Sequence, residues 1–199
     1  MPRSQTERTQ STRTALVTAA RRLFAAHGYA ATPAQDIVAA ANVTRGALYH
    51  HYGGKLGLFR VVLEQLESEL TERVRAEIAG EADVWTAAVR GLTAYFDVCQ
   101  QPEVVRIALT DAPAVLGWAA WREVEAAHGL GLITESLRSA VDAGILAPQP
   151  VEPLAQLVLS AIIEAALMIT YAEDTAAARE QAQRALLSLL GGILTPSGG

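Results

Sequence analysis

The feature that most constrains the fold is a set of closely spaced helix start and stop signals in residues 28–54. Gly28 is typical of a helix end, and Thr32-Pro33 suits a helix start because threonine caps and proline fits the first helical position. Asn42 tolerates a left-handed turn. Thr44 can cap the next helix, which Gly53-Gly54 ends. The sequence therefore predicts two short helices joined by a tight turn.

A longer helix is expected before this pair. Its apolar positions from Ser11 onward have helical spacing, whereas residues 1–10 are polar and are expected to form a disordered arm. A long helix followed by two short ones predicts a three-helix helix-turn-helix unit. The expected small core of the unit is Ile37, Val38, Ala41, Val43 and Leu48.

The rest of the chain also has a helical pattern. A long helix is expected from Leu56 to about Ile78, followed by helices at about 83–100, 103–110, 115–143, 152–171 and 175–190. The prediction is an all-α protein with about nine helices. Its expected parts are a helix-turn-helix domain at 11–55, a helical domain at 56–192 and a flexible tail at 193–199.

Charge is divided unevenly along the chain, although the total is −5. Residues 1–60 carry eight basic and two acidic side chains, a net charge of +6. The remaining residues carry eight basic and nineteen acidic side chains, a net charge of −11. A basic lobe joined to an acidic body indicates that only the first part contacts a polyanion.

The cellular location is predicted from what the sequence lacks. Cys99 is the only cysteine, which suits a reducing compartment and leaves no internal disulfide. The N-terminus has no apolar signal region, and the longest apolar run, about 154–172, is interrupted by Gln156 and Glu164. A soluble, cytoplasmic protein is expected.

The helix expected at 44–52 has the dimensions of a DNA-reading helix. Eight residues span about 12 Å, roughly the width of a B-DNA major groove. Arg45 could pair with guanine and Ala47 could touch a thymine methyl group, while Tyr49 could reach phosphate. The residues predicted to contact DNA are Thr32, Ala34, Gln35, Thr44, Arg45, Gly46, Ala47, Tyr49, His50 and Lys55.

The stretch DIVAAANVTRGALYHHYGGK, residues 36–55, resembles the DNA-binding segment of the TetR family of bacterial regulators. The resemblance covers roughly residues 12–60. It implies a homodimer that binds a near-palindromic operator, a helical C-terminal domain that binds a small-molecule effector, and repression that the effector relieves. It also implies dimerisation through the last two helices, about 152–171 and 175–190. Asn42, Gly53-Gly54 and Gly57 depart from the usual family residues, and the glycines leave the position of Lys55 in question.

Aromatic and polar side chains of the C-terminal part could line an effector pocket, because such pockets are mostly apolar with a few polar groups. Trp118 and Trp121 are the first choice, since they lie three residues apart and share a helix face. The full set of candidates is Tyr95, Phe96, Trp118, Trp121, Glu164 and Met168. Core or dimer packing is the alternative for each of them.

Two other function classes remain as alternatives. A helical-bundle metal protein or enzyme would need paired Glu-x-x-His motifs, and Glu125 with His128 supplies one such pair. His50 and His51 are adjacent on a helix and point about 100° apart, so they chelate one metal poorly. We expect no catalytic residue, no metal and no cofactor. A regulator that activates, or that needs no ligand, is the other alternative; effector, operator and target genes stay open.

Overall fold

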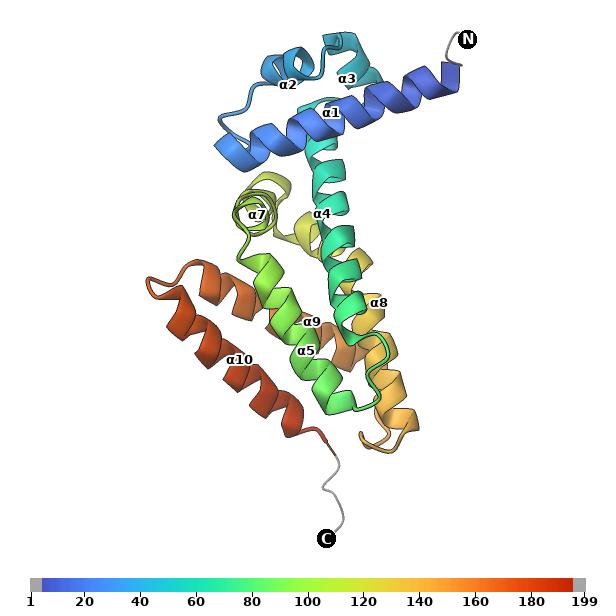
Figure 1. Cartoon of the computed structure of the whole chain (residues 1–199), viewed down its shortest axis with the longest axis vertical. Coiled ribbons are helices and arrows are strands. Elements are labelled where there is room, and N and C mark those ends of the chain that lie inside the picture. The colour runs from blue at the N-terminus through green and yellow to red at the C-terminus, as the bar shows by residue number, and fades with distance from the viewer. Residues whose placement is uncertain (1–4, 195–199) are drawn as a thin grey trace. The chain divides into compact units, whose positions relative to one another are not determined.

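The computed structural model describes residues 5–194, which form helices and loops with one isolated β-bridge between Leu146 and Leu194 (Figure 1). The prediction of an all-α fold is therefore confirmed. The chain forms two compact units. The first contains the chain up to Leu66 together with Pro102–Trp121, and the second contains Glu67–Gln101 and the chain from Arg122 onward.

The first unit is built on three helices and the first part of a fourth. It also holds a run of short helical segments that comes much later in the sequence. Its elements are α1 (Gln5–His27), α2 (Ala34–Ala40), α3 (Arg45–Tyr52), the start of α4 (Lys55–Ile78), α6 (Pro102–Val104), the π-helix η1 (Val105–Asp111), α7 (Ala112–Leu116) and the first turn of α8 (Trp118–Asp142).

Helix α1 begins at Gln5, so residues 5–10 are helical, where the sequence predicted a disordered arm. No proline or glycine interrupts this stretch, and Glu7 lies in the first turn, where a negative charge is favourable to the helix dipole. The polar composition that indicated disorder belongs to an exposed helical turn. Residues 1–4 of the predicted arm lie outside the described residues.

An aromatic cluster holds the core of the first unit together. The ring centroids of Phe24 and Phe59 lie 5.3 Å apart, and those of Tyr29 and Phe59 lie 4.9 Å apart. Ile37 of α2 and Leu48 of α3 are fully buried with them. The two short helices are therefore attached to the unit through one apolar face each.

The segment from α6 to α7 is tied to α1 within the first unit. The Arg21 guanidinium donates to both carboxylate oxygens of Glu103, from Nε at 2.8 Å and from Nη2 at 2.9 Å. The Tyr29 amide donates to Asp111 at 2.7 Å. The sequence predicted one domain at 11–55 and another at 56–192, so this unit combines parts of both.

The second unit contains the rest of α4 and α8 together with α5 (Val84–Cys99), α9 (Val151–Thr170) and α10 (Thr175–Gly191). Helix α9 packs against α10 and α5 (Figure 1). The side chains of Asp83 and Asp174 cap α5 and α10, accepting the amides of Thr86 at 2.7 Å and Ala177 at 3.0 Å. The predicted tail at 193–199 lies beyond the described residues from position 195 onward.

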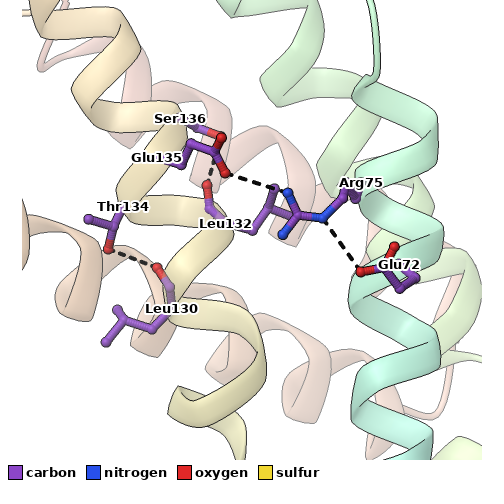
Figure 2. A network of polar contacts seen from close by, with 7 residues as sticks. All are labelled: Glu72, Arg75, Leu130, Leu132, Thr134, Glu135 and Ser136. Atoms are coloured by element: carbon purple, nitrogen blue, oxygen red, sulfur yellow. Dashed lines mark hydrogen bonds and ion pairs between the residues drawn. The ribbon is translucent and has the colours of Figure 1, made fainter.

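A polar network joins α4 and α8 in the second unit (Figure 2). Arg75 lies 3.6 Å from Glu72 on its own helix and donates to Glu135 of α8 at 3.5 Å. On α8, the hydroxyls of Thr134 and Ser136 donate to backbone carbonyls four residues earlier. The ion pairs are exposed and therefore stabilise the fold only slightly, but they show that α4 and α8 are neighbours.

Helix α9 is long and apolar enough, by length and composition, to cross a membrane. The same is true of many core helices of soluble proteins, so this is weak evidence for a membrane span. Its buried face includes Ile163, Ala166 and Ile169, and the helix packs against two neighbours. Packing within the helical unit accounts for this buried face.

Candidate functional site

The turn between α2 and α3 has the geometry that its sequence predicts. Asn42 has a φ of 52°, the one positive value at a non-glycine residue of the described chain. The Val43 amide donates to the Val38 carbonyl at 3.0 Å and closes the turn. The asparagine thus takes the left-handed conformation that a glycine would otherwise supply.

The N-terminus of α3 is capped and faces solvent. Thr44 is the N-cap, and its hydroxyl accepts the Ala47 amide at 3.2 Å, as predicted. Arg45 and Gly46 are exposed and Ala47 is half-buried, whereas Leu48 is fully buried. The helix is thus anchored by one side and presents its first turn outward.

Farther along α3, an arginine–tyrosine pair lies on the exposed face. The Arg45 guanidinium lies 5.5 Å from the centroid of the Tyr49 ring, and Nη2 donates to the Tyr49 hydroxyl at 3.4 Å. His50 is exposed beside them. At the end of the helix, the Tyr52 hydroxyl donates to the Arg13 carbonyl at 3.0 Å and ties α3 to α1.

The glycines that follow α3 allow a close approach between α3 and α4. Gly53 is the left-handed C-cap of α3, with a φ of 69°. A Cβ atom on Gly57 would lie 1.9 Å from the Tyr52 carbonyl oxygen, too close for any other residue without a backbone shift. This junction therefore requires Gly57, one of the glycines that depart from the family pattern, and the left-handed C-cap favours glycine at position 53.

Lys55 and Thr32 are engaged within the first unit. Lys55 Nζ donates to the carbonyls of Tyr29 at 2.9 Å and Thr32 at 3.0 Å, and it lies 3.9 Å from the Tyr29 ring centroid. Burial lowers the pKa of Lys55. The Thr32 side chain is buried and donates to the Gly28 carbonyl at 2.7 Å. Both side chains hold the loop between α1 and α2, and their predicted contact with phosphate stays a prediction.

The start of α2 differs from the expected cap. Pro33 is the N-cap, and its hydrocarbon ring makes no side-chain hydrogen bond. The Thr32 hydroxyl donates to the Gly28 carbonyl instead of capping α2. Gln35 is exposed and Ala34 is half-buried. The first turn of α2 therefore keeps backbone amides that have no side-chain cap, which is the arrangement that suits an anion.

The interior of the second unit holds a group of polar side chains from three helices. Glu67 of α4 and Glu125 of α8 are both buried, with 5% and 4% of their surface exposed. Burial, the Glu125 charge and a hydrogen bond with Glu125 raise the pKa of Glu67 well above its ordinary value. Two carboxyls that share a proton in this way carry less than two negative charges.

Tyr95 and Cys99 of α5 complete this group. Burial is the largest cause that raises the pKa of Tyr95, followed by the charges of Cys99, Glu125 and Glu67. The Tyr95 hydroxyl donates to the Cys99 sulfur, and burial raises the pKa of that thiol. A cysteine in this state is protonated at neutral pH and is a poor nucleophile.

The six residues predicted to line a pocket fall in different places. In the first unit, the rings of Trp118 and Trp121 are in contact at 5.0 Å, with Trp121 fully buried and Trp118 60% exposed. In the second unit, Phe96 is buried against Tyr95, whereas Glu164 and Met168 lie on the exposed face of α9. Of this set, only Tyr95 and Phe96 are associated with the interior of the second unit.

Sequence reasoning missed Glu67 and Glu125 as an interior pair. Glu67 lies on the apolar stripe of α4, four residues after Leu63 and three before Leu70, where a charge is unusual. Glu125 directly follows Val124 on α8, and both side chains are buried. A search for acidic residues at core positions would have found the first, but their proximity depends on tertiary structure.

No group of three or more His, Cys, Asp or Glu side chains with metal-binding geometry occurs among residues 5–194. Glu125 and His128 keep the Glu-x-x-His spacing on α8, but no second pair joins them in that range. The geometry that stands out is instead a capped, outward-facing helix on a basic lobe. This defines the class of helix-turn-helix DNA-binding proteins.

Comparison with known proteins identifies the family. Residues 16–62 match the model for bacterial regulatory proteins of the tetR family, and residues 85–193 match a tetracyclin repressor-like C-terminal domain. A TetR-family regulator from Pectobacterium atrosepticum is 36% identical, with a TM-score of 0.85 over 98% of this chain and 99% of that chain. The chain belongs to the TetR family of DNA-binding transcriptional regulators, which are not enzymes.

Other relatives are more distant or match only in part. The regulator CymR of Pseudomonas putida is 40% identical over 77 residues, which are 39% of this chain and 38% of that protein. UidR of Escherichia coli is 27% identical over 99% of this chain and all of that protein. RolR, solved with the ligand resorcinol, is 16% identical with a TM-score of 0.75 over 93% of this chain and 90% of that chain. The last likeness concerns the fold alone.

Proposed function

We propose that this regulator is a homodimeric, sequence-specific repressor that a small-molecule effector releases from DNA. The observation that carries the proposal is the first turn of α3. It is exposed, capped by Thr44 and fixed from behind by the buried Leu48 and by the hydrogen bond from Tyr52. A helix that is packed against its unit on one side and exposes polar groups on the other can enter a major groove without rearrangement.

The residues along the outward side of α3 have two kinds of proposed role, base contact and phosphate contact. Arg45 reads guanine through a bidentate contact, and the small Gly46 and Ala47 let the backbone approach the base edges. Tyr49 and His50 reach phosphates and fix the position of the helix. The Arg45–Tyr49 contact holds the guanidinium before DNA binds, which reduces the entropy lost on binding.

The start of α2 and the loop before it take a supporting role. The amides of Ala34 and Gln35 at the uncapped N-terminus suit a backbone phosphate. Thr44 adds its hydroxyl at the start of α3. Thr32 and Lys55 support these contacts from beneath, since both side chains are hydrogen-bonded inside the unit.

Homodimerisation through α9 and α10 is supported by an exposed apolar surface on these helices. Leu157, Met168 and Tyr171 are 68%, 59% and 65% exposed, and Leu189 of α10 is 58% exposed. Large apolar side chains grouped at a surface indicate a protein contact. We therefore assign Glu164 and Met168 to this outer face in place of the pocket.

Effector binding is proposed for the interior of the second unit. Helix α4 forms part of this interior through Glu67 and continues without a break into the first unit. A ligand that binds one position of α4 better than another would change DNA affinity by that difference in free energy. A regulator of this kind works in the cytoplasm, where its DNA is.

Selection of bound duplexes from a random DNA pool, at a stated salt concentration, tests the proposal. A dimeric reader enriches a near-palindrome whose half-sites are about one helical turn apart. Retention that depends on salt but enriches no sequence would contradict sequence-specific reading. Enrichment of a single half-site would contradict the dimer, and activation of a reporter by the operator-bound protein would contradict repression.

A further inference from the structure

Polar groups from three helices meet in the interior of the second unit. They are Glu67 and Thr71 of α4, Tyr95 of α5 and Glu125 of α8. We propose that this cluster binds an effector that carries a protonated amine on an apolar body, with the ammonium group held between the two carboxyls. The inference rests on the proposed function, because it names the chemical class of that effector.

The burial of two carboxyls is the first argument. Glu67 and Glu125 are hydrogen-bonded to each other with almost no exposed surface. Burying acidic groups side by side costs free energy, and apolar residues of similar size would make a more stable core. A pair of this kind in a helical core therefore indicates a ligand that offsets the cost.

Thr71 gives a second, independent observation. Its side chain is 7% exposed, and its hydroxyl has no hydrogen-bond partner. Thr71 follows Glu67 by four residues, so the two side chains lie on the same buried face of α4, one turn apart. A buried hydroxyl without a partner, next to a carboxyl, is an acceptor available to a donor that enters the interior.

Tyr95 of α5 lies beside the glutamate pair. It is surrounded closely enough that burial dominates the rise in its pKa, yet part of the residue remains accessible. Buried apolar residues neighbour the cluster along the same helices, among them Leu70, Phe96 and Val124, and suit the apolar body of a ligand.

The charge of the cluster favours a cation over other ligands. Every cause that acts on the pKa of Glu67 raises it, so the pair holds a proton strongly. An ammonium group can take the place of that proton and donate to both carboxylates, because charge-assisted hydrogen bonds are strong in a poorly solvated site. A carboxylate ligand would be repelled.

Binding of the amine should release the shared proton to solvent, so affinity should rise with pH. The titratable groups that face the pair are Tyr95 and Cys99 from α5, both with a raised pKa and neutral at pH 7. His128 lies half-buried on α8, one turn beyond Glu125. Proton release should therefore come from the glutamate pair, and a His128→Gln variant should release protons as the wild type does.

The test uses the full chain and three probes that share one body: phenylbutylamine, phenylbutanol and phenylbutyrate. Titration calorimetry at pH 6 and pH 8, in two buffers of different ionisation enthalpy, measures affinity and proton release. The amine should bind about ten- to a hundredfold more tightly than the alcohol, with proton release and higher affinity at pH 8. Equal affinity for amine and alcohol, or no binding of the amine, would overturn the inference.

Matched variants locate the site. Glu67→Gln and Glu125→Gln should each weaken amine binding by about tenfold or more and abolish proton release. The controls Glu72→Gln on α4 and Glu123→Gln on α8 remove exposed carboxylates from the same helices and should bind as the wild type does. Thermal unfolding of each variant shows that it is folded. Undiminished binding by both interior variants would overturn the assignment.

A DNA-binding assay separates this inference from the proposed function. If the amine binds but leaves affinity for the selected duplex unchanged, the site stands and release by an effector fails. If the duplex is bound specifically and the amine does not bind, the ligand class alone fails.

Discussion

The exposed surface of α3 and the interior of the second unit hold polar side chains in opposite environments, one in water and one withdrawn from it. On α3, Arg45 and Tyr49 contact each other but are both exposed, so they remain available to a large anionic partner. In the interior, Glu67 and Glu125 are withdrawn from water and share a hydrogen bond. A surface that binds DNA needs rigid backing, whereas buried polar groups are kept at a cost in stability.

The largest effect on stability is expected at the junction between α3 and α4. Gly57→Ala places a Cβ atom against the Tyr52 carbonyl oxygen, so the backbone of α3 or α4 has to shift. We expect a loss of about 3 kcal/mol or more in the free energy of unfolding. Urea denaturation measures it. Gly131→Ala, which meets open space within α8, is the control and should stabilise the protein by about 0.4–1 kcal/mol.

The buried glutamate pair can be tested through the pH dependence of the protein's stability. The pKa of Glu67 is raised in the folded state, so folding takes up a proton between the unfolded and folded pKa values. The stability due to that proton is complete below the unfolded pKa and is lost as pH rises through the folded pKa. Glu67→Gln should remove this loss, so the variant gains in Tm relative to wild type as pH rises. Parallel curves for the two proteins would refute the buried pair.

The Lys55 ammonium group helps to hold the loop between α1 and α2. Lys55→Met keeps most of the side chain's length but removes two hydrogen bonds and leaves the carbonyls of Tyr29 and Thr32 without their donor. The expected loss of stability is about 1–3 kcal/mol. Arg60→Met, on the exposed side of α4, should change it by less than about 0.5 kcal/mol. Equal losses in the two variants would show that Lys55 has no special structural role.

The cap of α3 should give the smallest effect. Thr44→Ala removes the acceptor of the Ala47 amide and should cost about 1 kcal/mol. Thr18→Ala changes a solvent-exposed residue in the middle of α1. This variant should be neutral or slightly stabilising, because alanine is the better helix former. Guanidinium denaturation distinguishes the two. A neutral Thr44→Ala would indicate that the amide is solvated equally well without the cap.

The DNA-binding unit was predictable because its signals are local. Asn42, Thr44 and Gly53 each specify a turn, a cap or a helix end within a few residues, and the structure confirms all three. The predicted start of the first helix was wrong, because polar composition does not distinguish an exposed helix from a disordered arm. The prediction that Thr32 caps the second helix was wrong, because its hydroxyl donates to the Gly28 carbonyl within the preceding loop and Pro33 is the N-cap.

The interior site was not predictable in the same way. Glu67 and Glu125 are 58 positions apart in the sequence and meet only because α4 and α8 are neighbours in the fold. The aromatic residues predicted to line a pocket lie in different places: Trp121 in the core of the first unit, Trp118 at the surface, and Tyr95 and Phe96 inside the second unit. Spacing alone does not say which face of a helix is covered. The same limit applies to the segment from α6 to α7, which joins the first unit through Arg21 and Tyr29.

The most direct test of the account is the affinity of wild type and Arg45→Ala for the selected duplex and for its single-base variants, measured by fluorescence anisotropy at fixed salt. We expect Arg45→Ala to lose about 1–3 kcal/mol of binding free energy and to stop discriminating at one base pair of each half-site. Arg22→Ala, which removes an exposed arginine of α1, should keep that discrimination. Unchanged affinity and unchanged discrimination in Arg45→Ala would contradict the claim that α3 reads the DNA.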